Sequence, residues 1–357
     1  MEATAPDITG EKATPSPTVT LVFLVFNRRE ELRTSLQQML SESDYSPDRV
    51  DAIVVDNAST DGSSDMVREE FPQVRLIVRQ ENVGVSGWND GFSVARGDWI
   101  LALDDDCYLP PDGLRRALEA ADEHAADLVS FRVVSTFHDV AFTDLYRTGL
   151  FMFWGCAVLI RGDVLRDLVG YDPEIFVWAN ELEFMMRFFD RGWRHLHLPE
   201  VEAQHMKPLP PLEGPLCIEE RGYRINARHW GYISAKLLRP RDAVEALIAL
   251  VSSQIRDGLR IERVALRAVP DTVRGFAHGL RHREAVRNPE VSRFYRRNFE
   301  TFASPWWIAR PLGDLVRSLP RELAAGEKPQ GVGRQQQYYA ERSRYYPESA
   351  ATLEFLR

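Results

Sequence analysis

Short apolar runs alternate with amphipathic segments through the first part of the chain. Residues 19–26 (VTLVFLVF) are almost continuously apolar, which is typical of a strand buried on both faces of a parallel sheet. Further strands are predicted at residues 50–55, 74–78, 99–103 and 128–134. Because apolar positions recur at helical spacing between these runs, the alternation predicts an α/β fold: a doubly wound, mostly parallel sheet flanked by helices.

The pattern changes in the second half of the chain. Residues 151–160 are apolar and aromatic around one glycine, and residues 176–189 form a helical run. Beyond them, residues 221–238, 243–261 and 281–301 have helical patterns with arginine-rich polar faces. The predicted organisation is a disordered leader at 1–17, an α/β domain at 18–235 and a mostly helical C-terminal region at 236–357.

Polar side chains follow three of the predicted strands. Asn27 follows the first strand and stands three residues before Glu30, a capping-box spacing that predicts Asn27 as the N-cap of a helix. Asp56 follows the second strand, and residues 104–106 (DDD) follow the fourth. Ligands of such sheets bind beyond the carboxyl ends of the strands, so we expect these side chains to share one site.

Three consecutive carboxylates repel one another and are costly to hold at the end of a buried strand. A divalent cation or a network of sugar hydroxyl groups would offset that repulsion. The simpler interpretation is an acidic turn that starts the next helix, since Asp is a good N-cap and Pro110 and Pro111 follow.

Bulk composition excludes some classes of function. The 357 residues carry a formal net charge of −9, which argues against a duplex nucleic-acid binder because such a protein needs a basic face. The three cysteines are far apart in the sequence, which fits reduced thiols and excludes a cysteine-rich zinc module. No signal peptide or membrane-spanning run is recognised, so we expect a cytoplasmic protein.

Six motifs occur together in one order, and in that order the chain resembles a family 2 glycosyltransferase with the GT-A fold, of the rhamnosyl- and galactofuranosyltransferase kind. The resemblance covers roughly residues 18–235. The motifs are Phe26-Asn27-Arg28, residues 55–62 (VDNASTDG), residues 82–91 (NVGVSGWNDG), residues 104–106 (DDD), residues 180–183 (NELE) and His205.

The resemblance implies a metal site that holds the pyrophosphate of a nucleotide-sugar donor. Asp106 is the first expected ligand and His205 the second, while Asp104 fits the ribose or a metal-bound water. Asp105 is either a donor contact or a solvated turn residue. Oxygen ligands suit Mg²⁺ or Mn²⁺, and one imidazole favours Mn²⁺.

The resemblance also implies that a carboxylate takes the proton from the acceptor hydroxyl. Glu181 stands at the position of this base, and Glu183 is the alternative. Because residues i and i+2 do not share a helix face, at most one of the two points into the site. Asn180 replaces the first acid of the family motif, which leaves the acceptor contacts of that acid open.

Donor contacts are expected at the ends of the first two strands and in the glycine-containing loop. Asp56 is expected near the nucleobase, because uracil and thymine offer an N–H donor to a carboxylate. The other expected donor contacts are Phe26, Asn27, Arg28, Asn57, Gly84, Gly87 and Asn89. Trp154, Trp178 and Asn180 are expected on the acceptor side, where aromatic faces stack on sugar rings, although core packing is an alternative for both tryptophans.

These residues predict a metal-dependent inverting glycosyltransferase that acts on a UDP- or dTDP-linked sugar and on a glycan or lipid-linked acceptor. One alternative is a degenerate GT-A domain that binds carbohydrate or acts as a scaffold. Another is a metal-dependent phosphoryl-transfer or hydrolytic enzyme. Trp306–Leu312 with nearby arginines suggests a peripheral contact with an anionic membrane, a core segment or an oligomer contact. The oligomeric state stays open.

Overall fold

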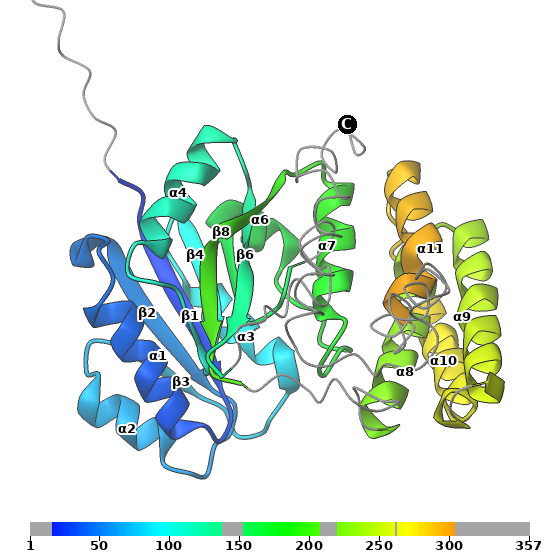
Figure 1. Ribbon diagram of the computed structural model, residues 1–357, viewed down its shortest axis with the longest axis horizontal. Helices are drawn as coiled ribbons and strands as arrows, with labels where there is room; N and C mark the ends of the chain where they lie inside the picture. Colours follow the sequence, from blue (N-terminus) through cyan, green and yellow to red (C-terminus); the bar gives the residue numbers. More distant parts are fainter. Residues whose placement is uncertain (1–15, 138–152, 208–219, 261–262, 304–357) are drawn as a thin grey trace, which may run out of the picture.

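A mixed eight-stranded sheet forms the centre of the N-terminal part of the protein (Figure 1). The computed structural model describes residues 16–137, 153–207, 220–260 and 263–303. In these residues the strand order is β3-β2-β1-β4-β7-β6-β8-β5. The strands are β1 (Val19–Val25), β2 (Val50–Asp56), β3 (Arg75–Val78), β4 (Trp99–Asp104), β5 (Cys107–Tyr108), β6 (Leu128–Ser135), β7 (Ala157–Arg161) and β8 (His195–His205).

One half of the sheet is parallel and the other is mixed. Strand β1 pairs in parallel with β2 and β4, and β2 pairs in parallel with β3. Strand β7 runs antiparallel to both β4 and β6, while β6 and β8 are parallel. The predicted α/β fold class is therefore confirmed. The reversal at β7 was not predicted, because an apolar run does not indicate strand direction.

Helices cover both faces of the sheet (Figure 1). One buried cluster includes Leu32, Leu36, Met66 and Leu114, whereas the cluster on the opposite face continues into the C-terminal helices. The helices of the α/β part are α1 (Arg29–Ser41), α2 (Ser63–Glu70), α3 (Trp88–Val94), α4 (Gly113–Glu123), α6 (Gly162–Leu168) and α7 (Asn180–Asp190).

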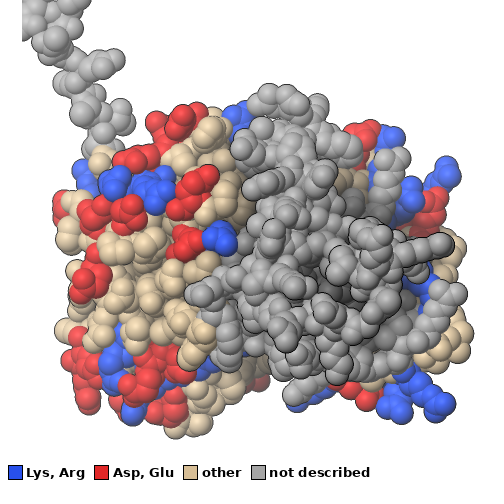
Figure 2. Space-filling view, viewed as in Figure 1, with Lys and Arg blue, Asp and Glu red and all other residues tan. Residues whose placement is uncertain are grey.

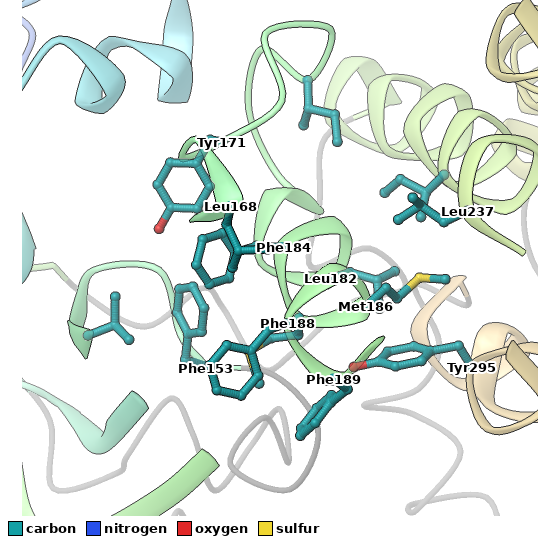
Figure 3. Packing of buried hydrophobic residues seen from close by; sticks show 14 of the residues in the cluster. Phe153, Leu168, Tyr171, Leu182, Phe184, Met186, Phe188, Phe189, Leu237 and Tyr295 are labelled. Carbon is teal, nitrogen blue, oxygen red and sulfur yellow. The ribbon is translucent and has the colours of Figure 1, made fainter. Parts of the chain in front are cut away.

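Helix α7 lies between the sheet and the C-terminal helices, and most of its residues are buried, including the polar Asn180 and Glu183. Figure 3 shows Phe184 and Phe188 directed toward Phe153 on one side of the helix. On the other side, Met186 lies near Tyr295. Helix α7, which begins with Asn180 and Glu181, is thus held by contacts with the α/β part on one side and with the C-terminal helices on the other.

The C-terminal helices are α8 (Glu220–Leu237), α9 (Pro240–Arg260), α10 (Arg263–Arg281) and α11 (Pro289–Ala303). Helices α8 and α10 pack closely at Gly231, Gly275 and Gly279: a Cβ on any of them would lie within 2.2 Å of a carbonyl oxygen of the other helix. Helix α8 therefore packs with the later helices, and the domain boundary predicted near residue 236 stays a prediction. Helix α10 was not predicted; it contains Pro270, which usually ends a helix.

Acidic and basic side chains are interspersed over the described residues seen in Figure 2, without an extended basic face in that view. Within the same described residues, no helix combines the length and the apolar composition needed to cross a bilayer. Cys107 and Cys156 are buried free thiols. The predicted leader (apart from residues 16 and 17), Cys217 and the Trp306–Leu312 segment lie outside the described residues.

Candidate functional site

The acidic cluster forms where β4 ends and β8 ends. Asp104 is the last residue of β4, and His205 is the last residue of β8, opposite Cys107 of β5. Asp104, Asp106 and His205 offer ligand atoms that all lie within 4.8 Å of one another. His205 Nε2 is 3.1 Å from Asp106 Oδ1. Asp106 and His205, which are almost a hundred positions apart along the chain, are thereby brought together, as the resemblance implied.

Burial and like charge make this cluster costly without a cation. Burial, together with the charge of Asp106, raises the pKa of Asp104 to about 6. Burial also acts to raise the pKa of Asp106, but the hydrogen bond from His205 and the charge of Arg28 hold it below its ordinary value. Two carboxylates and one imidazole are a donor set that fits Mn²⁺ or Mg²⁺, so these residues could hold a divalent cation.

The side chain of Asp105 contacts the segment that follows β1. Its Oδ2 accepts a hydrogen bond of 3.2 Å from the backbone N–H of Phe26, and its Oδ1 lies 3.2 Å from Arg28 Nη1. Arg28 also pairs with Asp106. Asp105 is buried, so the solvated-turn alternative is wrong. Its contact with Arg28 helps to hold that side chain beside Asp106. The role of Asp105 in donor binding stays a prediction.

Glu181 is the carboxyl group of α7 that lies against Gly155. The carbonyl oxygen of the next residue, Cys156, accepts a hydrogen bond of 2.9 Å from the backbone N–H of Asp104. Burial raises the pKa of Glu181 to about 7, and the negative charge of Asp104 adds to this effect, while the backbone N–H of Gly155 opposes it by donating a hydrogen bond. A Cβ at Gly155 would lie 2.3 Å from Glu181 Oε1. Gly155 was not predicted as a site residue, although a lone glycine within an apolar run was the available signal.

Glu183 points in another direction, as the i and i+2 argument predicted. Its carboxylate is fully buried and lies 2.6 Å from Arg187 Nη2 and 2.9 Å from Lys236 Nζ. Lys236 also contacts Asp172 Oδ2 at 2.7 Å. Glu183 is therefore committed to an ion-pair network that joins α7 to α8, and this placement does not support its predicted role as an alternative base. Lys236 and Asp172 were not predicted here, since nothing in the sequence pairs them.

The loop after β2 is tied to the start of α1. Asn27 has a left-handed φ of 56°, and its Oδ1 accepts a hydrogen bond of 2.7 Å from the backbone N–H of Thr60. Asp61 Oδ2 accepts from the backbone N–H of Arg29 at 2.9 Å. The predicted N-cap is therefore wrong: Arg28 occupies that position, and Asp61 from the neighbouring loop satisfies the helix terminus.

The Asp56 and Asn57 side chains are buried in the same loop. Asp56 Oδ1 accepts a hydrogen bond of 2.7 Å from the backbone N–H of Ser59, and Asp56 Oδ2 accepts one from the Ser64 hydroxyl. Asn57 Nδ2 donates to Gly84 O at 3.0 Å. Both side chains shape the loop, and their contacts with a nucleotide stay predictions.

The glycines of the 82–91 motif serve internal packing. Gly84 has φ +65°, and a Cβ there would lie 1.8 Å from Phe176 O. A Cβ at Gly87 would lie 2.6 Å from Leu24 Cδ1. Asn89 donates to Tyr171 O and accepts from Tyr171 N, each at 2.8 Å. The motif is explained by contacts within the protein, so the donor contacts expected at Gly84, Gly87 and Asn89 remain untested.

Replacing Gly84 by Ala is expected to destabilise the protein strongly. Gly192→Ala is the matched control, because Gly192 has φ +77° but a methyl group added there would meet no atom within 4 Å. The left-handed backbone should cost about 1–2 kcal/mol in both variants, and overpacking against Phe176 should add about 1–3 kcal/mol for Gly84 alone. Urea unfolding curves measure the difference, and equal losses in the two variants would contradict the close approach.

The segment before α7 is strained and exposed. Trp178 and Ala179 are consecutive residues with left-handed φ values of 61° and 62°, a conformation that persists in non-glycine residues only where its surroundings enforce it. The Trp178 side chain is 44% exposed. Trp154, in contrast, is partly buried against the core, and Asn180 is buried. Of the three predicted acceptor residues, Trp178 is the exposed one.

The chain is similar to known glycosyltransferases in part of its sequence. Residues 20–173 match the family model described as Glycosyl transferase family 2. The chain is similar to the succinoglycan biosynthesis protein ExoO of Rhizobium meliloti, with 35% identity over 31% of this chain and 32% of ExoO. It is also similar to the glycosyltransferase AglE of Haloferax volcanii, with 23% identity over 53% of this chain and 67% of AglE. The match thus spans only about a third of the length of ExoO.

A solved structure supports the fold. The crystal structure of S. aureus TarS 1–349 is 16% identical and covers 83% of this chain and 91% of its own, with a TM-score of 0.53. At this identity the likeness concerns the fold alone, and it agrees with a GT-A sheet flanked by helices.

Proposed function

The chain belongs, through residues 20–173, to glycosyl transferase family 2, and we propose that it transfers a sugar from a nucleoside diphosphate donor to a hydroxyl acceptor. The proposal is supported by the contacts that connect Glu181 to a cluster that fits a divalent cation (Asp104, Asp106 and His205). The buried Glu181 carboxyl group lies against Gly155, and the next residue, Cys156, accepts a hydrogen bond of 2.9 Å from the backbone N–H of Asp104.

Asp104, Asp106 and His205 are proposed to hold Mn²⁺ or Mg²⁺. When bound, such a cation neutralises the negative charge that develops on a pyrophosphate leaving group. Arg28 pairs with Asp106 and Asp105, so its guanidinium lies where it can also attract the donor phosphates. The donor is proposed to be UDP- or dTDP-linked, with its base near the loop of Asp56 and near Phe26, whose side chain is 44% exposed.

Transfer with inversion is proposed, with Glu181 as the general base. A base must be ionised and must reach the proton of the attacking hydroxyl. Glu181 is connected to the cation cluster through Gly155 and Cys156, and its raised pKa is suited to proton transfer near neutrality. The exposed side chain of Trp178 is proposed to stack on the acceptor, a glycan or lipid-linked glycan. The similarity to ExoO, a succinoglycan biosynthesis protein, supports polysaccharide assembly as the setting.

Activity is expected to rise with pH through the ionisation of Glu181. Because burial raises the pKa of Glu181 from 4.5 to about 7, the carboxylate that acts as base is lost as the pH falls below that value. A bound cation would offset the charge of Asp104, so the midpoint in the loaded enzyme should lie between 4.5 and about 7. The pH profile of kcat/KM measures this midpoint, and a rate that is constant from about pH 3.5 to about pH 8 would contradict the assignment.

A thermal-shift panel of nucleotide sugars, with Mn²⁺ or with EDTA, tests the proposed function. A ligand that binds the folded state raises Tm by mass action. We expect UDP- or dTDP-linked sugars to raise Tm only when Mn²⁺ is present. A cation-dependent shift with simple phosphate esters and none with any nucleotide sugar would instead favour a phosphoryl-transfer enzyme. Binding without any transferred product would favour a degenerate domain.

A further inference from the structure

A second cluster of metal-ligating side chains lies away from the site described above. His278 and His282 are four residues apart, at the end of α10 and just beyond it, and therefore share one face. Glu174, from the segment between α6 and α7, completes the group, and the three side chains offer ligand atoms within 4.8 Å of one another. Glu174 Oε2 lies 2.7 Å from His278 Nε2. The cluster joins the α/β part to the C-terminal helices.

The surroundings orient both imidazole rings. His282 Nδ1 lies 3.2 Å from the backbone carbonyl oxygen of His278. When Nδ1 carries the proton and donates this hydrogen bond, Nε2 keeps its lone pair free for a metal. Metal-binding histidines are oriented in the same way, by a hydrogen bond from the ring nitrogen that does not bind the metal. The ring of Tyr232 packs against His278 and His282, with ring centroids 5.4 Å and 6.0 Å apart. The two histidine rings are 4.5 Å apart.

The nearby charges leave the cluster open to a cation. Lys236 lies next to Tyr232, and its charge is balanced by Asp172 and Glu183. Of the two arginines that flank His282, Arg283 donates to the carbonyl oxygens of Ala235 and Leu238, and Arg281 is exposed to solvent. Tyr232 donates its hydroxyl proton to Asp172 Oδ2 at 2.8 Å rather than to the cluster. Glu174 is exposed on the surface and pairs with His278. A metal can therefore reach the group from solvent.

We propose that Glu174, His278 and His282 bind a divalent transition metal, with Zn²⁺ as the best match. Two imidazoles and one carboxylate form a His₂Glu set that zinc binds in tetrahedral geometry, with water as the fourth ligand. Tetrahedral zinc holds its ligand atoms roughly 3.3 Å apart, so small side-chain rotations close the group. Metal binding at His278 Nε2 would use the lone pair of that nitrogen and replace its contact with Glu174.

A metal here would fasten the end of α10 to the segment that leads into the candidate catalytic helix. That segment is already held at Asp172 by Lys236, at Phe176 by the backbone N–H of Val85, and at Trp178 by His229. Glu174 lies within it, so the metal would add one more tie between the C-terminal helices and the residues before α7. This role does not depend on the proposed sugar transfer.

Metal titration of the full chain tests the second site. The Asp106→Asn variant lacks a ligand of the first cluster. After metal has been stripped from it with EDTA, the metal ions that bind at the second site can be counted alone. We expect this variant to bind one Zn²⁺ per chain, and Co²⁺ to give the visible absorption of a tetrahedral site. Adding His278→Ala or His282→Ala should abolish both signals, whereas adding His124→Ala, an exposed histidine of the α/β part, should leave them unchanged.

Glu174→Gln provides a milder test, because it keeps the size of the side chain and removes one charged ligand. It should weaken Zn²⁺ binding by at least roughly tenfold, while the circular dichroism spectrum stays that of the parent. The proposal would be overturned if the stoichiometry and the Co²⁺ spectrum were the same with and without the two histidines. It would also be overturned if the Asp106→Asn parent, shown to be folded, bound no metal. Glu174 and His278 would then form only an ion pair.

Discussion

Glu181→Gln is expected to slow sugar transfer by roughly 10²–10⁴-fold while leaving nucleotide-sugar affinity nearly unchanged, as for the loss of a general base. Gln has almost the same shape as Glu and keeps a carbonyl oxygen for the Gly155 N–H, but it cannot take a proton. Initial rates and donor affinities measured by calorimetry separate the two effects. The residual activity should also lose the pH dependence proposed for Glu181.

Glu183→Gln is the matched control, because it makes the same chemical change two residues away on the same helix. Glu183 is buried between Arg187 and Lys236, and removing one partner of a buried ion pair typically costs about 3–5 kcal/mol. This variant should therefore lose stability, while its folded fraction keeps near-normal turnover. If Glu181→Gln retained normal turnover and Glu183→Gln lost it, the two assignments would have to be exchanged.

Asp106→Asn is expected to abolish cation-dependent donor binding and to lower transfer by at least roughly 10²-fold. Asp106 contacts His205 and Arg28 at once, so its carboxylate is the centre of the cluster. Asn retains the size of the side chain but supplies no negative charge to a hard divalent cation, which prefers carboxylate oxygen. Isothermal titration of UDP in the presence of Mn²⁺ measures the loss.

Asp65→Asn serves as the control for this variant, because Asp65 is an exposed residue of α2 that pairs with Arg68 in the same helix. It should bind donor normally, since surface ion pairs contribute little. Tm values for both variants separate a binding defect from unfolding. Normal Mn²⁺-dependent binding by a folded Asp106→Asn protein would exclude Asp106 as a ligand.

The parallel half of the fold and the first cluster could be predicted from the sequence because their signals are local. Continuous apolar runs mark β1, β2 and β4, and polar residues at their carboxyl ends must share one edge of the sheet. His205 was added by resemblance to a family, since the pairing of β5 with β8 that brings it to Asp106 involves distant segments.

Other features depend on contacts between distant segments and were missed. Asn27 has the spacing of an N-cap, yet Thr60 takes its side-chain oxygen and Asp61 caps the helix instead. Glu183 has the spacing of a second catalytic acid, but Lys236 reaches it from a helix more than fifty residues later. In each case the local sequence pattern is compatible with two sets of side-chain contacts. A residue from a distant segment of the chain determines which set forms.

The release of nucleoside diphosphate from a panel of nucleotide sugars, measured with and without Mn²⁺, tests most directly whether the acidic cluster and Glu181 form one catalytic site. We expect UDP or dTDP, with its diphosphate intact, to be released from at least one donor when the cation and an acceptor glycan are present. Glu181→Gln and Asp106→Asn should each suppress this release. Cation-independent release, or release unchanged in both variants, would contradict a single catalytic site built from these residues.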